Sequence, residues 1–227
     1  RLRRPLFAIE DITETWLADG EKAKDAFNRK FLTVRPRTSP AAKEHFLYPD
    51  STYYGNNSPT SNILPLAFGM VPEECRKAVE GNLLHSLIVD KKGSNYTAHV
   101  ASGVVGVNWM MRLLTAIGRG DVAAGLISHT EYPGFGYEVS KGATTIWELW
   151  NGDKAARAMN SLNHVMMLGD LVNWLYQDLG GINPAKPGYK EILLKPDFSV
   201  DDIDSCSVSY NTPYGLLGSK WNKTLSR

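Results

Sequence analysis

The spacing of apolar residues changes near residue 180, and this change limits the folds open to the chain. Up to Leu179 the apolar residues recur at helical spacing, as they do on the buried face of an amphipathic helix. After Gly180 and Gly181, which are typical of a helix end, short segments alternate apolar and polar residues as strands do. Helices followed by strands argue against an alternating α/β fold and predict a mainly α fold with a β domain appended.

We predict six helices before this change and strands after it. The helices are expected over residues 6–32, 60–69, 73–88, 104–117, 121–128 and 161–179. The fourth is apolar nearly all round and should be buried, and the last has the clearest helical pattern. The segments "YKEILLKP" and "CSVSYNTPYGLLGSKWNK" are expected as strands, the second as a pair joined by a turn. We therefore place a domain boundary between a helical part, residues 1–183, and a β part, residues 184–227.

Composition excludes several classes of partner and cofactor. A net charge of +1 gives no field that would attract nucleic acid or an anionic membrane surface. No apolar stretch is long enough to span a membrane. Cys75 and Cys206 form neither a disulfide framework nor a metal-binding pair, and two free thiols are favoured over one long-range bridge. We expect no metal and no cofactor, because the sequence shows neither a metal cluster nor a phosphate-binding glycine loop.

The segment "YPGFGYEVSKGATTIWELWNGD", residues 132–153, is the richest in residues suited to catalysis. Aromatic planes suit the apolar faces of sugar rings, and cleavage of a glycosidic bond needs carboxylates beside them. Glu148 lies beside Trp147 and near Trp150, so partial removal from water should raise its pKa and suit acid–base catalysis. The alternative is that both tryptophans anchor a core and Glu148 is an ion-paired helix residue.

Other polar residues are weaker candidates. Glu138 and Asp153 are typical of helix caps or surface acids. His164, expected at the start of the last helix, is either a core histidine or part of a site. His99 precedes a predicted buried helix and is either a structural residue, which is favoured, or faces the same cleft. The segment 53–62, "YYGNNSPTSN", is either a helix-capping cluster or a sugar contact.

Four segments together resemble one known family. They read, in order, "YGNNSPTSNILPLAFGMVPEE", "HVASGVVGVNWMMRLLTAIGRGDVA", "YPGFGYEVSKGATTIWELWNGD" and "MNSLNHVMMLGDLVNWLYQDLGGI". They resemble the C-terminal half of the catalytic domain of glycoside hydrolase family 78, the bacterial α-L-rhamnosidases. The following "PGYKEILLKP" resembles the entry to that family's C-terminal β-sandwich. The resemblance covers nearly the whole chain, and "GATTIWE" is its most specific part.

The resemblance implies an (α/α)6 toroid that hydrolyses terminal α-L-rhamnose with inversion and without a cofactor. Its "TTxWE" glutamate is the general base, which corresponds to Glu148, and its "NH" histidine contacts the sugar, which corresponds to His164. Trp147 or Trp150 is expected to wall the site. The family's "WERW" reads "WELW" here, so Leu149 replaces an arginine and the fine positioning of substrate is in doubt.

The resemblance also implies that this chain holds only part of the (α/α)6 toroid, so that the toroid is incomplete here. Inverting hydrolysis needs two carboxylates roughly 6.5–9.5 Å apart. The family's general acid lies upstream of the matching segments, so we expect this chain alone to be inactive and its parent to cleave rhamnose-containing glycosides or oligosaccharides. The parent is expected in the periplasm or cytoplasm of a bacterium. The alternatives are another (α/α)6 exo-glycosidase and a non-catalytic carbohydrate-binding or scaffold module.

We predict that the isolated chain self-associates. Helix faces that pack against neighbouring helices in a complete toroid are exposed when those helices are missing, and apolar patches of several hundred Å² promote association. Light scattering at high protein concentration should detect the oligomer, and a strictly monomeric particle would contradict the prediction.

Overall fold

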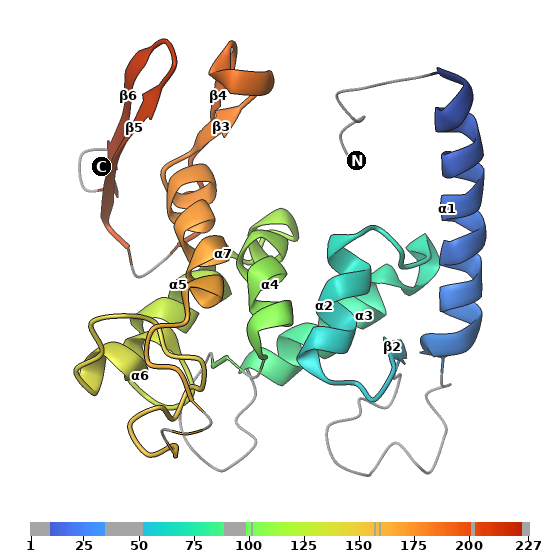
Figure 1. Cartoon of the computed structure of the whole chain (residues 1–227), viewed down its shortest axis with the longest axis horizontal. Coiled ribbons are helices and arrows are strands. Elements are labelled where there is room, and N and C mark those ends of the chain that lie inside the picture. Colours follow the sequence, from blue (N-terminus) through green and yellow to red (C-terminus); the bar gives the residue numbers. More distant parts are fainter. Residues whose placement is uncertain are drawn as a thin grey trace. The chain divides into compact units, whose positions relative to one another are not determined.

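Figure 1 shows the computed structural model of the chain, which describes residues 10–34, 52–88, 99–100, 102–156, 158, 160–200 and 203–223. The chain divides into two compact units, residues 1–86 and 87–227. Both units contain helices, and the two longest strands of the described part lie in the second unit. Each unit is described here by itself.

The first unit consists mainly of helices. Its elements are α1 (Glu10–Phe31), β1 (Leu32–Val34), β2 (Thr52–Tyr54), α2 (Pro59–Ala67) and α3 (Glu73–Ile88), which runs two residues into the second unit. The strands pair antiparallel. Helix α3 follows Pro72 and carries Glu73 and Glu74 in its first turn, where negative charge is favourable. The helices predicted over residues 60–69 and 73–88 are confirmed, and the one predicted over 6–32 is confirmed from Glu10 to Phe31, with residues 6–9 outside the described part.

The polar segment between β2 and α2 is a hydrogen-bonded turn. The buried Asn62 side chain accepts the N–H of Tyr54 at 2.9 Å and donates to the Asn57 side chain at 2.8 Å. The Ser58 hydroxyl accepts the N–H of Ser61 at 3.3 Å and so caps α2. The helix-capping interpretation of this segment is therefore confirmed.

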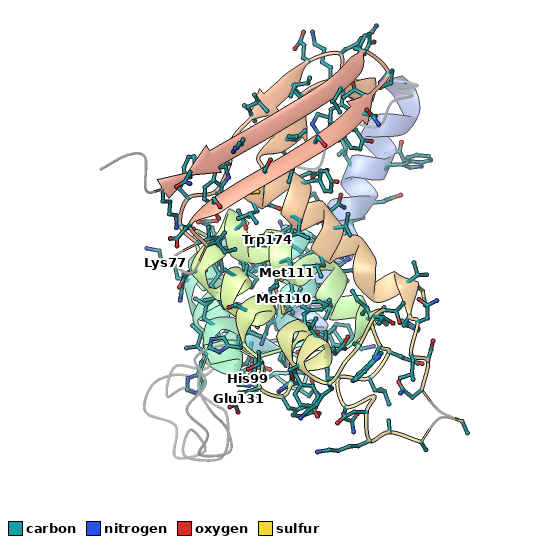
Figure 2. The ribbon with its side chains drawn as sticks, turned by 90° about the vertical axis from the view of Figure 1, so that its left-hand side faces the viewer. Lys77, His99, Met110, Met111, Glu131 and Trp174 are labelled. Atoms are coloured by element: carbon teal, nitrogen blue, oxygen red, sulfur yellow. The ribbon has the colours of Figure 1, made fainter. Side chains whose placement is uncertain are left out.

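The second unit packs its helices around a core of large side chains. Its helical elements are α4 (Val104–Ala116), α5 (Gly120–Ser128), α6 (Phe135–Ser140), a 3-10 turn (Val165–Met167), α7 (Leu168–Asn173) and a π-helical segment (Trp174–Leu179). Figure 2 shows Met110, Met111 and Trp174 together in its interior. The Trp174 indole also donates to the Thr115 hydroxyl at 2.9 Å, which ties the π-helical segment to α4.

Helix α4 has the expected bounds but not the expected burial. It ends just before Gly118, which adopts a φ of +76°. Within its unit α4 packs against α5 and α7 with one face. Val105 lies off that face and is 57% exposed, so the prediction of a helix buried all round is wrong.

The predicted helix over residues 161–179 is helical only from Val165 onward. Ser161 to His164 are not helical, and their backbone is hydrogen-bonded to a segment distant in sequence. The Glu148 N–H donates to the Ser161 carbonyl at 2.9 Å, and the His164 N–H donates to the Ile146 carbonyl at 2.8 Å. The predicted helix end at Gly180 and Gly181 is confirmed.

The chain turns to β structure after this helix, as predicted. The strands are β3 (Ile182–Pro184), β4 (Ile192–Leu194), β5 (Ser205–Thr212) and β6 (Gly215–Asn222). The first two pair antiparallel, and the last two form an antiparallel hairpin that turns at Pro213 and Tyr214. Within the second unit the order of helices first and strands second is confirmed, whereas β1 and β2 of the first unit were not predicted. Strand β3 was not predicted, because three residues ending in proline carry little strand signal.

Three further findings concern the surface and chemistry of the described residues. Among their helices, none is both long and apolar enough to cross a membrane. They contain no group of three or more His, Cys, Asp or Glu residues that could hold a metal ion. Cys75 in the first unit and Cys206 in the second are free thiols.

Candidate active site

Two segments of the second unit, residues 146–148 and 161–164, are joined by backbone hydrogen bonds and bring Glu148 and His164 together. Besides the two backbone hydrogen bonds between them, the Glu148 side chain contributes a third contact: its Oε2 accepts the Ser161 N–H at 3.0 Å. His164 Nδ1 lies 3.9 Å from the same oxygen. The two residues that the sequence predicts as base and sugar contact are therefore neighbours in space.

The Glu148 side chain is accessible to solvent rather than enclosed by tryptophans. It is 41% exposed, whereas the His164 side chain is 16% exposed. Its neighbour Trp147, in contrast, is buried. The expected desolvation of Glu148 is thus not found, but its carboxylate is open to water and to a ligand.

Both tryptophans anchor the loop that carries Glu148. Trp147 is 7% exposed, and its ring lies so close to Gly152 that a Cβ there would sit 2.7 Å from Trp147 Cε3. The Trp150 indole donates to the Ser102 carbonyl at 2.9 Å and meets the Phe135 ring edge-on at 5.1 Å. Their role as a wall of the sugar site stays a prediction.

Glu138, on α6, is the buried carboxyl of this region. It is 2% exposed, and its Oε2 accepts the Trp147 N–H at 3.1 Å. Its Oε1 has no hydrogen-bond partner among the described residues. Burial raises the pKa of Glu138 to about 7, and the hydrogen bond from Trp147 opposes that rise in part. Glu138, which had been expected to be a cap or surface acid, is therefore a buried carboxyl group with a raised pKa.

Asp153 lies in the loop that carries Glu148 and is hydrogen-bonded to Tyr137 on α6. The Tyr137 hydroxyl donates to its carboxylate at 3.0 Å. Burial and, after it, this carboxylate raise the pKa of Tyr137. Asp153 itself is exposed, in agreement with the expectation of a surface acid.

A cavity of about 390 Å³ adjoins the pair of Glu148 and His164. His164 and Glu138 both line it, together with apolar side chains from three helices, namely Ile127, Phe135, Val139 and Leu171. Glu148 and the two tryptophans are not among its lining residues in the described part of the chain. His99 also lies outside this lining; it is buried, and its backbone N–H donates to the Leu87 carbonyl at 2.9 Å.

We expect Glu138→Gln to remove a pH dependence of stability. The folded pKa of about 7 lies above the ordinary value of 4.5. Between these values the folded protein holds a proton that the unfolded chain has lost, so the free energy of unfolding falls as pH rises through this window. The loss reaches at most about 3 kcal/mol above pH 7. Glutamine keeps an acceptor for Trp147 but does not titrate, so the variant should be the more stable protein at pH 8.

Urea unfolding at pH 5 and pH 8 measures this effect. The two proteins should differ little at pH 5 and by roughly 1–3 kcal/mol at pH 8. Glu131→Gln is the matched control, because Glu131 is exposed and the same chemical change there should leave the pH dependence intact. Parallel pH dependences of the wild type and Glu138→Gln would contradict the prediction.

Two family descriptions match consecutive parts of the chain. The bacterial alpha-L-rhamnosidase 6 hairpin glycosidase domain matches residues 7–179. The bacterial alpha-L-rhamnosidase C-terminal domain matches residues 181–227.

Curated relatives support the same assignment. An alpha-L-rhamnosidase of Formosa agariphila is 34% identical over 174 residues, which cover 73% of this chain and 18% of that protein. An alpha-L-rhamnosidase of Streptomyces avermitilis is 28% identical over 208 residues, which cover 89% of this chain and 19% of that protein. The chain thus spans about a fifth of the length of these relatives.

Solved structures show the same fold. An alpha-L-rhamnosidase from Dictyoglumus thermophilum matches with a TM-score of 0.77 and 29% identity, covering 94% of this chain and 22% of that one. The Streptomyces avermitilis alpha-L-rhamnosidase, complexed with L-rhamnose, matches with a TM-score of 0.76 and 22% identity, covering 92% of this chain and 18% of that one. The helical part fits the (α/α)6 toroid, which confirms the predicted fold class. The chain belongs to the bacterial α-L-rhamnosidase family and carries a glycoside hydrolase domain of that family.

Proposed function

We propose that the protein containing this chain is an inverting α-L-rhamnosidase in which Glu148 is the general base and His164 contacts the sugar. The observation that carries this proposal is the pair itself. This chain belongs to the family, and Glu148 and His164 are the residues that match two of its motifs. Their side chains lie 3.9 Å apart, although the segments that carry them are 13 or more residues apart in sequence. The names of the relatives supply the substrate class, rhamnose-containing glycosides.

The geometry around Glu148 suits the activation of water. Oε2 accepts the Ser161 N–H, so the carboxylate is held in one orientation while its exposed part can accept a proton from water. In inverting hydrolysis the base removes that proton as the water attacks the sugar on the face opposite the leaving group. His164, beside the same oxygen, is placed to hydrogen-bond a sugar hydroxyl and so to fix the ring relative to the water.

The general acid is proposed to come from another part of the parent protein. An inverting site needs a second carboxyl group across the glycosidic bond. In the family this residue lies upstream of the segments that match here. We therefore keep the expectation that this chain alone is inactive. The division of the chain between residues 183 and 184 likewise remains a proposal.

Product analysis of the full-length protein tests the function. With a panel of aryl glycosides, we expect turnover of the α-L-rhamnoside in preference to the others. NMR spectra recorded in the first minutes should show β-L-rhamnose, the inverted product. A product that is initially the α anomer would exclude inversion, and preference for another sugar would favour a different (α/α)6 exo-glycosidase. Turnover by the isolated chain at ordinary glycosidase rates would contradict the incomplete site.

A further inference from the structure

The segment that carries Glu148 is held from two sides. On one side it pairs with residues 161–164. There the His164 N–H donates to the Ile146 carbonyl at 2.8 Å, and the Glu148 N–H donates to the Ser161 carbonyl at 2.9 Å. The N–H of Trp147, which lies between these two residues, donates instead to Glu138 Oε2 at 3.1 Å. Glu138 is thus the described side chain that binds the backbone of this segment from its second side.

The Glu138 carboxyl is fixed in place and costly to bury. The Lys141 and Ala143 N–H groups donate to its backbone carbonyl at 3.1 and 3.0 Å, which holds the end of α6 under the loop. An apolar side chain of the same size would avoid the desolvation cost of a carboxyl group. It would, however, leave the buried Trp147 N–H without its acceptor. Among the described contacts of the Glu138 carboxyl group, the hydrogen bond from the Trp147 N–H is therefore the one that offsets the desolvation cost.

We propose that Glu138 is a positioning residue, which acts through the Trp147 N–H to fix the Ile146–Glu148 segment and thereby the carboxylate of Glu148. This inference rests on the proposed role of Glu148 as general base. Because an error of about 1 Å in the position of a catalytic group can lower the rate up to about a hundredfold, a hydrogen bond to the adjacent residue has a direct effect on turnover. In this role Glu138 acts through Trp147 rather than on the sugar or the water.

The hold on Trp147 depends on pH. An ionised carboxylate is a stronger acceptor than a neutral carboxyl group, so the bond to Trp147 tightens when Glu138 loses its proton. Burial places the pKa of Glu138 at about 7. The titratable or charged groups around Glu138 come from α6 and the chain next to it, from the chain after α5, and from the paired segments and the loop between them. They are Tyr137, Lys141, His129, Glu148, His164 and Asp153. None of them forms a described ion pair with Glu138. We therefore expect kcat to rise in a step near pH 7.

The experiment compares three variants of the full-length protein with an aryl α-L-rhamnoside. Glu138→Met removes the acceptor and should lower kcat about tenfold or more while KM stays within roughly threefold. Glu138→Gln keeps the acceptor and should stay within about threefold of wild-type kcat at pH 6, but it should lack the step near pH 7. Glu131→Gln, the exposed control, should change neither kcat nor the pH profile. Circular dichroism and melting temperature establish that each variant is folded.

Each outcome bears on the inference separately from the proposed function. A folded Glu138→Met protein with wild-type kcat, or one that changes KM alone, would overturn the positioning role while leaving Glu148 as the base. If Glu138→Met does not fold, the glutamine variant decides, since a step near pH 7 that persists in it would also overturn the role. Full turnover by Glu148→Gln would instead remove the proposed base, and the inference about Glu138 with it.

Discussion

Glu148→Gln in the full-length protein is expected to lower turnover by a factor on the order of 10²–10⁴, and by more if no other group can activate water. Glutamine has nearly the same shape and keeps an oxygen that can accept the Ser161 N–H, so the fold and the sugar affinity should remain. The amide cannot take a proton from water, so the chemical step is what should fail. Initial rates with an aryl α-L-rhamnoside, together with rhamnose binding by calorimetry, separate the two effects.

Azide provides the control for this variant. A small anion can occupy the place of the activated water and attack the sugar without a base, so azide should restore turnover and give the β-L-rhamnosyl azide, whose configuration is inverted. The wild-type rate should not rise. Turnover of Glu148→Gln at the wild-type rate would reject the assignment of the base and favour a non-catalytic sugar-binding module.

Gly181→Ala should destabilise the folded chain by about 3–5 kcal/mol, the largest stability loss that we expect from a single methyl group. Gly181 has a φ of +75°, and an added Cβ would lie 2.2 Å from the Pro196 nitrogen and 2.6 Å from the Lys195 carbonyl carbon. Backbone atoms cannot move aside cheaply, least of all here, where the Lys195 N–H donates to the Gly181 carbonyl at 2.9 Å. The left-handed strain and the steric clash therefore add.

Gly188→Ala separates these two causes. Gly188 has a φ of +69°, but nothing lies within 4 Å of the Cβ that alanine would add. This control carries the strain without the clash and should lose only about 1–2 kcal/mol. Urea unfolding of the two variants and the wild type gives the three free energies. Equal losses of unfolding free energy for both variants would show that the backbone at Pro196 and Lys195 moves aside for the methyl group without a measurable energetic cost.

The sequence predicted the features of the fold that depend on local patterns. The bounds of α2, α3 and α5 follow from capping residues and helical spacing, and the β5–β6 hairpin follows from its turn. The non-helical conformation of residues 161–164 could not be read in this way, because their backbone is hydrogen-bonded to residues 146–148. Apolar residues at helical spacing there predicted a longer helix, and a non-local backbone interaction overrode that preference.

The candidate site was predictable in its residues but not in their environments. Motifs identified Glu148 and His164, and the structure places them together. The sequence did not reveal that Glu148 is exposed while its neighbour Trp147 is buried, so burial was expected at the wrong carboxyl group. Glu138 becomes the desolvated acid only through the packing of α5, α6 and α7 around it. Nothing in its immediate neighbours in sequence distinguishes it from a surface residue.

The pairing of residues 146–148 with 161–164 also decides where this family can diversify. Both residues of the proposed catalytic pair lie on the paired segments, whereas Asp153 and Lys154, in the chain between them, are exposed. Lengthening a surface loop costs little, since each doubling of its length adds only about 0.6 kcal/mol of closure entropy. A loop inserted after Lys154 could therefore evolve, or be engineered, to recognise a new leaving group while the base and the histidine keep their spacing.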